Sequence, residues 1–112
     1  MIHLLTEKVT TQQVQEMLKQ YSNMIKIVVD IRRLSLAGGG DMHADCEDIL
    51  LDKGSRQSDL WGANWYPATE KIEFDSLINI RPRDGNRSIF IQNREIQQKV
   101  EAVIRQLLGG IQ

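Results

Sequence analysis

The stretch MIKIVVDI, residues 24–31, constrains the fold more than any other part of the sequence. Its β-branched residues at alternate positions, from Ile25 to Ile31, would share one face of a strand. Such residues favour strands, so we expect a core strand here. In RRLSLAGGG, residues 32–40, the two arginines can form a turn, and the chain can return as a short second strand before the glycines end it.

Two segments have the apolar spacing of amphipathic helices. The first follows Thr10, which forms a capping box with Gln13, and its apolar stripe runs from Val14 to Tyr21. The second follows the capping residue Asn93 and ends at the glycine pair 109–110. The apolar stripe of this second helix consists of Ile96, Val100, Val103, Ile104, Leu107 and Leu108.

The segment GGGDMHADCEDILL, residues 38–51, fits either a capped helix or a strand. In a helix that starts near Asp41, an apolar stripe would run from Met42 to Leu50, and Gly54 would supply a left-handed C-terminal cap. In a strand, residues 43, 45 and 47 would share a face instead. We favour the helix, because Asp41 is a good N-cap, carboxylates suit the positive end of a helix dipole and β-branched residues are scarce here.

The segment from 59 to 91 predicts three strands. DLWGANWYP, residues 59–67, places Trp61, Ala63 and Trp65 on one side. KIEFDSLINIRP, residues 71–82, alternates between an apolar and a polar side, which indicates a sheet with one wet face. Asp84 and Gly85 predict a hairpin turn, with SIFI, residues 88–91, as the return strand. The apolar side of 71–82 has Ile72, Phe74, Ile78 and Ile80, and the polar side has Glu73, Asp75, Asn79 and Arg81.

The predicted order of elements is α-β-β-α-β-β-β-α. Short links between neighbouring strands favour a mainly antiparallel sheet of about five strands, with three helices on one face, which is an α+β fold. A chain of 112 residues is too short for two cores, so we expect a single domain over residues 1–112.

Composition and charge exclude several classes of protein. Hydrophobic residues make up 41% and charged residues 26%, which is typical of a globular chain. The net charge is −1 and the basic residues are scattered, so nucleic-acid binding is disfavoured. A single cysteine excludes an internal disulfide, and no apolar run is long enough for a membrane span. We expect a cytoplasmic protein without membrane association.

Residues 38–47 suggest three kinds of site, each with a simpler structural explanation. The glycines before a helix resemble a phosphate cradle, but the motif lacks the Lys and Ser/Thr of a P-loop. His43, Asp45 and Glu47 could share a metal ion, but a zinc site needs about four ligands. Cys46 could be a nucleophile, but its place in the apolar stripe favours packing. We therefore predict no metal and no cofactor.

The late hairpin carries the most interesting polar residues. Arg81 and Arg87 flank the predicted turn, so both guanidinium groups could reach one carboxylate or phosphate. They could instead pair with nearby aspartates and only hold the loop. Trp61, Trp65 and Tyr66 could stack on a ligand, although in so small a domain they favour core packing.

Three long motifs resemble a domain family of unknown function found in cyanobacteria and other bacteria, over roughly residues 24–108. They have the patterns GGxxHAD, GSxQxDxWG and INIRPxxGNRS. The family pattern often has an acidic residue where this chain has Cys46, which weakens a thiol mechanism further. The motif positions here are Gly39, Gly40, Asp41, His43, Ala44, Asp45, Gly54, Ser55, Gln57, Asp59, Trp61, Gly62, Asn79, Arg81, Pro82, Gly85, Asn86, Arg87 and Ser88.

The resemblance implies no reaction, but it singles out polar residues that a fold alone does not demand. Our leading hypothesis is a small binding or regulatory domain, with a homodimer as an open alternative, that recognises an anionic ligand or a partner segment through the hairpin from Arg81 to Arg87, with His43 and Asp45 nearby. One alternative is a hydrolase-like enzyme with His43 or Asp45 as acid-base and Arg81 and Arg87 as charge stabilisers. Another is a purely structural polar network. The predicted ligand-binding residues are His43, Asp45, Gln57, Asp59, Asn79, Arg81, Asn86 and Arg87.

Overall fold

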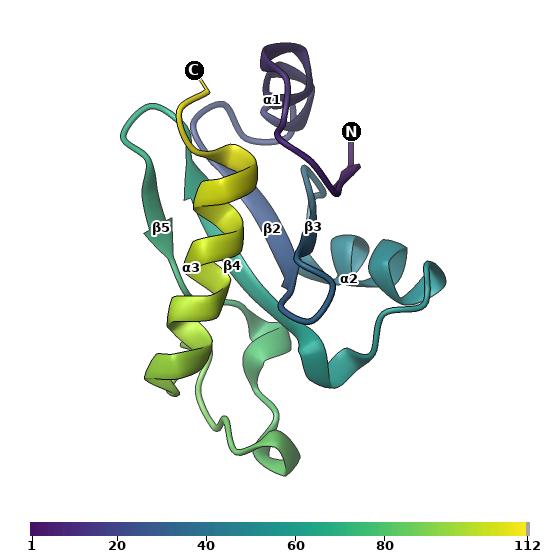
Figure 1. Cartoon of the computed structure of the whole chain (residues 1–112), viewed down its shortest axis with the longest axis vertical. Coiled ribbons are helices and arrows are strands. Elements are labelled where there is room, and N and C mark those ends of the chain that lie inside the picture. Colours follow the sequence, from purple (N-terminus) through teal and green to yellow (C-terminus); the bar gives the residue numbers. More distant parts are fainter. Residues whose placement is uncertain (112) are drawn as a thin grey trace.

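The computed structural model describes residues 1–111 and contains one five-stranded antiparallel sheet with three α-helices (Figure 1). The predicted α+β class is therefore confirmed. The sheet order is β1-β3-β2-β4-β5. The strands are β1 (His3–Leu5), β2 (Ile25–Asp30), β3 (Ser35–Gly38), β4 (Leu60–Tyr66) and β5 (Lys71–Glu73), and the helices are α1 (Thr11–Met17), α2 (His43–Asp52) and α3 (Arg94–Leu108).

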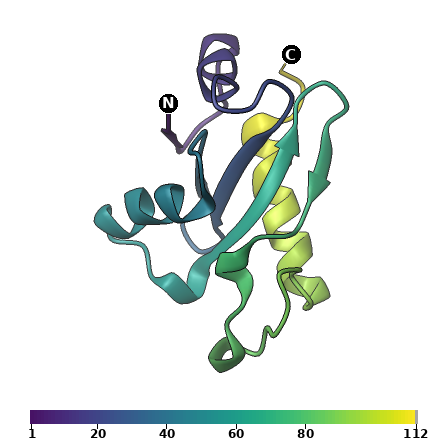
Figure 2. The same cartoon turned by 180° about the vertical axis from the view of Figure 1, so that it is seen from behind.

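The helices cover both faces of the sheet, which corrects the prediction that they share one face (Figures 1 and 2). α1 and α3 pack on the face that carries Ile27, Trp61 and Trp65, where the main core lies. α2 packs on the other face through Cys46 and Leu50, against Val28, Ala37 and Leu60. Strand β2 is apolar on both sides for this reason. Within residues 1–111 none of the helices combines the length and apolar character needed to cross a membrane.

The predicted caps place the outer helices correctly. Thr10 and Gln13 form the capping box of α1, although this helix ends at Met17 rather than near Tyr21. The Asn93 side chain accepts a hydrogen bond from the Ile96 amide and begins α3. β1 was not predicted, because three residues are too few to show a period.

α2 begins one residue later than predicted. Met42 is its N-cap, and the Asp45 carboxylate accepts a hydrogen bond from the Met42 amide at 3.1 Å. The Asp41 carboxylate instead accepts hydrogen bonds from Gln20 and Tyr21, so it is not free to cap the helix. Gly54 has a φ of 97° and follows the helix end, as the left-handed cap requires.

The predicted strands over 74–91 are wrong. This segment forms two 3₁₀ turns, Leu77–Asn79 and Pro82–Asp84. Its β-type pairing is limited to two isolated antiparallel bridges, Asp75 with Phe90 and Arg81 with Asn86. The apolar residues predicted to share one side of a strand therefore do not share it: Ile78 packs on the α2 side of the sheet, and Ile80 is exposed.

The cause lies next to Gly62. β5 pairs with β4 only at residues 64–66, so the backbone of Gly62 has β2 on one side but no strand on the β5 side. The Asn79 amide takes that place and bonds both the N–H and the carbonyl of Gly62. Ser76 passes so close that a Cβ on Gly62 would lie 2.5 Å from the Ser76 Cβ, which explains why this position needs glycine.

Candidate functional site

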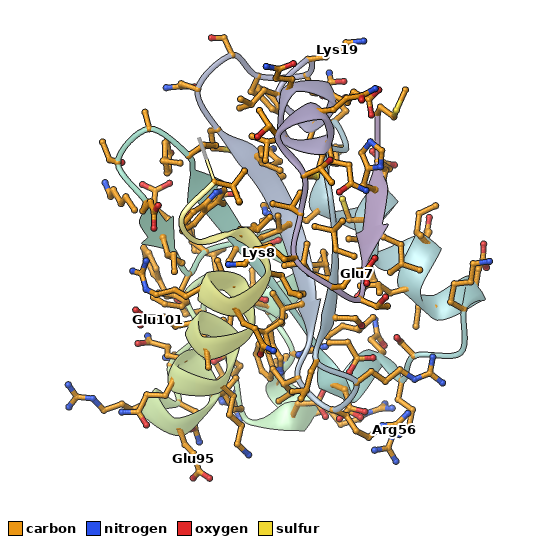
Figure 3. The ribbon with its side chains drawn as sticks, turned by 45° about the horizontal axis from the view of Figure 1, so that its top comes forward. Glu7, Lys8, Lys19, Arg56, Glu95 and Glu101 are labelled. Atoms are coloured by element: carbon orange, nitrogen blue, oxygen red, sulfur yellow. The ribbon has the colours of Figure 1, made fainter. Side chains whose placement is uncertain are left out.

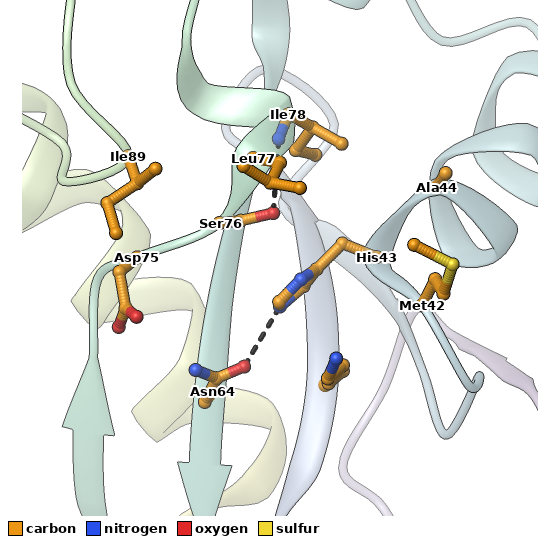
Figure 4. Close-up of a pocket in the computed structure, with 10 residues that line it drawn as sticks. Met42, His43, Ala44, Asn64, Asp75, Ser76, Leu77, Ile78 and Ile89 are labelled. Atoms are coloured by element: carbon orange, nitrogen blue, oxygen red, sulfur yellow. Dashed lines mark hydrogen bonds between the residues drawn. The ribbon is translucent and has the colours of Figure 1, made fainter.

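An open cleft of about 420 Å³ lies between the N-terminus of α2 and the segment that follows β5 (Figure 4). Its polar lining comes from Lys26 on β2, His43 on α2, Asn64 on β4 and Asp75 after β5. Its volume lies within the range typical of small-molecule sites. The other lining residues are Met42, Ala44, Ser76, Leu77, Ile78 and Ile89.

Strand register brings the polar side chains together. Lys26 lies opposite Asn64, and Asn64 lies opposite Glu73, so the three form a row across β2, β4 and β5. Because side chains alternate along a strand, this row shares the α2 side of the sheet with Val28. The α2 side of the sheet is therefore apolar under the helix and polar beyond its N-terminus.

Four side chains form a continuous hydrogen-bonded chain, which we call the polar chain: His43, Asn64, Glu73 and Tyr66. His43 Nε2 lies 2.9 Å from both Ala63 O and Asn64 Oδ1. Asn64 Nδ2 donates to Glu73 Oε1 at 3.5 Å, and the Tyr66 hydroxyl donates to the same oxygen at 2.7 Å. Figure 4 shows the link between His43 and Asn64 at the wall of the cleft.

The polar chain fixes the tautomer of His43. A carbonyl oxygen can only accept, so the contact with Ala63 O requires that Nε2 carries the hydrogen. The Tyr66 hydroxyl lowers the pKa of Glu73, which keeps that carboxylate ionised and turns the Asn64 NH₂ group toward it. The Asn64 oxygen then faces His43. Nδ1 of the neutral imidazole is left as an acceptor.

His43 favours the neutral form. Burial lowers its pKa below 6.5, and the positive charge of Lys26 lowers it further, while hydrogen bonds to Ala63 and Asn64 and the charge of Asp75 act in the opposite direction. The net direction is downward, so the imidazole is mostly uncharged at neutral pH. The cleft thus presents a neutral acceptor together with one cation and one anion.

The predicted site residues divide into separate groups. Only His43 lines the cleft. Asn79 and Asn86 are buried, with exposed fractions of 0% and 2%, and they form what we call the asparagine network. Asn79 bonds the backbone of Gly62 and Ile89. Asn86 donates to the carbonyls of residues 79, 88 and 90 and accepts from the amide of residue 92.

The two arginines of the late hairpin have different environments. The Arg81 side chain is only 9% exposed, and its guanidinium lies 4.1 Å from the centre of the Trp61 ring. It donates to the Gln57 carbonyl and forms an ion pair with Asp84 at 3.5 Å. Arg87 is exposed, and its backbone amide donates to the Gln92 side chain. Neither arginine lines the cleft.

The remaining predicted residues make local contacts. Asp45 caps α2, as described above, and Asp59 accepts hydrogen bonds from Arg32 and Arg56. Glu47 is buried next to Arg81, and burial raises its pKa against the opposing effects of Gln57 and Arg81. Within residues 1–111 no three His, Cys, Asp or Glu side chains gather as metal ligands would.

Cys46 is buried under the sheet. Burial raises the pKa of its thiol to about 11, so it is an inert packing residue at neutral pH.

Three cleft residues were missed by sequence reasoning: Lys26, Asn64 and Asp75. Lys26 and Asn64 interrupt apolar strands, and a polar residue inside such a strand marks a face that is not fully packed. That pattern could have found them one at a time. Their grouping depends on the register between strands, which the sequence does not show.

Comparison with known proteins identifies a family but no activity. The family model described as "Protein of unknown function (DUF5674)" matches residues 3–107. No curated protein and no solved structure matches the chain.

Proposed function

The chain belongs to the DUF5674 family, and from its site we propose that it is a small-molecule binding domain whose ligand occupies the cleft beside His43. The observation that carries this proposal is the polar chain. It holds one imidazole in one tautomer at the wall of an open cleft. Preorganised polar groups in a mostly apolar recess are typical of ligand sites.

The cleft is a better supported site than the hairpin with two arginines. Arg81 is buried against Trp61 and bonds the Gln57 carbonyl, and although its Nε and Nη2 atoms have no hydrogen-bond partner, they are closed off from solvent, so an anion could reach them only by displacing neighbouring residues. Arg87 alone is a single exposed cation, which binds anions weakly in water. Anion recognition by this pair is therefore not the function that we propose.

The hydrolase alternative shares the same imidazole. A neutral histidine with a free Nδ1 can accept a proton, as a general base must. However, the charge-stabilising role was assigned to Arg81 and Arg87, and neither lines the cleft. Binding needs no such group and is the function that the geometry supports best.

An NMR fragment screen tests the proposal. ¹H–¹⁵N spectra would be recorded with mixtures of small amines, carboxylates, amides and aromatic alcohols. We expect shift changes to concentrate at Ala44, Asn64 and Leu77, which line the cleft. His43→Ala and the milder His43→Gln should weaken them, since both remove the Nδ1 acceptor.

His3→Ala is the matched control. His3 pairs with Glu16 at 2.8 Å and is not part of the cleft lining, so removing its imidazole should leave fragment binding unchanged. If no fragment shifts the signals of the cleft residues, or if the His43 variants bind fragments in the same way as His3→Ala, the proposed function is wrong.

A further inference from the structure

The cleft presents two opposite charges that have no hydrogen-bonding or ionic partner. Within residues 1–111 neither the Lys26 ammonium nor the Asp75 carboxylate makes a hydrogen bond or an ion pair with the protein, and the Lys26 ammonium lies over the Tyr21 ring, 5.2 Å from its centre. Both charges act on His43, one lowering and the other raising its pKa. A ligand can therefore find a cation, an anion and one imidazole in the same cleft.

The strand arrangement sets how far apart these charges stand. Lys26 on β2 and Glu73 on β5 are separated by two strand spacings, which amount to about 10 Å between backbones. Asp75 follows Glu73 by two residues and lies beyond it along the chain. This backbone spacing favours a ligand whose two charges are several bonds apart over an α-amino acid, which carries both charges on one carbon.

Much of the remaining cleft lining is apolar. Leu77 is 71% exposed and Met42 is 52% exposed, although both side chains line the cleft together with Ile78 and Ile89. Figure 4 shows Asp75 and His43 on either side of Asn64, with Leu77 above them. Exposed apolar side chains at the rim of a polar cleft favour a ligand with an apolar middle.

We infer that the cleft, if it is the ligand site proposed above, takes a small zwitterion whose ammonium and carboxylate are joined by a short apolar chain. The ligand carboxylate meets Lys26 and the ligand ammonium meets Asp75. His43 Nδ1 accepts a further hydrogen bond from the ammonium, since the polar chain leaves this atom without a hydrogen. This assignment replaces a purely anionic ligand with one that carries both charges.

A length series tests this inference by NMR titration of the full chain. The probes are glycine, γ-aminobutyrate and ε-aminocaproate, with caproate and hexylamine as analogues that each lack one charge. We expect ε-aminocaproate to bind more tightly than glycine. Each analogue with one charge should bind roughly tenfold more weakly than ε-aminocaproate, because it loses one charge-assisted hydrogen bond.

Variants assign each charge to its partner. Asp75→Asn should weaken ε-aminocaproate and hexylamine but not caproate, and Lys26→Gln should weaken ε-aminocaproate and caproate but not hexylamine. Lys19→Gln and Asp52→Asn make the same charge changes at exposed positions outside the cleft lining and should have no effect; Figure 3 shows Lys19 at the outer end of α1. Alanylalanine also has separated end charges but joins them through a polar peptide group, so it should bind more weakly than ε-aminocaproate, and tighter binding of the dipeptide would contradict the apolar linker.

Two outcomes separate this inference from the proposed function. If other fragments shift the cleft residues while zwitterions bind no better than their analogues with one charge, the inference is wrong and the binding function stands. If no probe of any kind shifts the cleft residues, both are wrong.

Discussion

Two polar regions of this protein use the same side chain, asparagine, in opposite ways. In the asparagine network, the side-chain amides of Asn79 and Asn86 form all their hydrogen bonds with backbone groups and are buried away from water. In the polar chain, Asn64 links His43 to Glu73 beside an open cleft. One region therefore holds the fold together, and the other leaves an acceptor, a cation and an anion facing a space that a ligand can fill.

The difference teaches how to weigh a polar motif. A buried polar side chain is stable only when its hydrogen bonds are complete, so complete pairing indicates a structural role. Unpaired hydrogen-bond acceptors and charges next to a cleft indicate a binding role, because they contribute little to the stability of the fold. By this criterion Asn79 and Asn86 belong to the fold, although they stand in the same motif set as His43.

The largest expected effect comes from Asn79→Ala. It would leave the amide and the carbonyl of Gly62 buried without partners, while the Ile89 carbonyl would keep its hydrogen bond from the Ser76 amide, and we expect a loss of about 3 kcal/mol in the free energy of unfolding. Asn64→Ala, the matched change in the polar chain, should cost about 1 kcal/mol or less, because its partners are side chains that can reach water. Urea denaturation measures both. Equal losses would remove the distinction between the two regions.

The two arginines of the hairpin provide the next comparison. Arg81→Ala removes a buried side chain that covers Trp61 and bonds the Gln57 carbonyl, so we expect a loss of about 2 kcal/mol. Arg87→Ala removes an exposed side chain and should stay within about 0.5 kcal/mol of the parent. Thermal unfolding of both variants checks this. A large loss at Arg87 would show that this residue, too, serves the fold.

Periodicity predicted the regular elements well because they are built from it. Strands β2 and β4 and helices α1 and α3 have apolar positions at the spacing of their own geometry. The segment 74–91 failed for a physical reason. Its alternating pattern is real, but the Asn79 and Asn86 side chains supply the hydrogen bonds that a neighbouring strand would have supplied.

The candidate site was predicted only through His43. Its neighbours Lys26, Asn64 and Asp75 come from three other places in the chain, and strand register decides that they meet. The motif residues Asn79 and Arg81 looked equally functional in the sequence, because a polar residue looks the same whether its partners are backbone groups or a ligand. The completed hydrogen bonds of Asn79 indicate its structural role, whereas Arg81 is assigned to the fold by its burial against Trp61, since its Nε and Nη2 atoms are buried without hydrogen-bond partners.

The smallest expected effect is the contribution of His43 to the pH dependence of stability. Burial lowers the pKa of His43 in the folded protein below the value of 6.5 that applies when the chain is unfolded. Between these two pKa values the unfolded chain binds more protons, so stability rises with pH in that window. The contribution is complete above pH 6.5 and is lost as the pH falls through the lowered pKa.

His43→Gln isolates this contribution, because glutamine can still donate to the Ala63 carbonyl but does not titrate. Glu47 acts in the opposite direction, since burial raises its pKa and its ionisation costs stability as the pH rises. The difference between parent and variant cancels that effect. We expect the stability advantage of the parent over His43→Gln, measured by urea unfolding, to shrink as the pH is lowered from neutral. This change should be smaller than the losses expected for Asn79→Ala and Arg81→Ala. A difference that grows on acidification would mean that His43 is stabilised in its charged form, and Nδ1 could then not accept a hydrogen bond from a ligand.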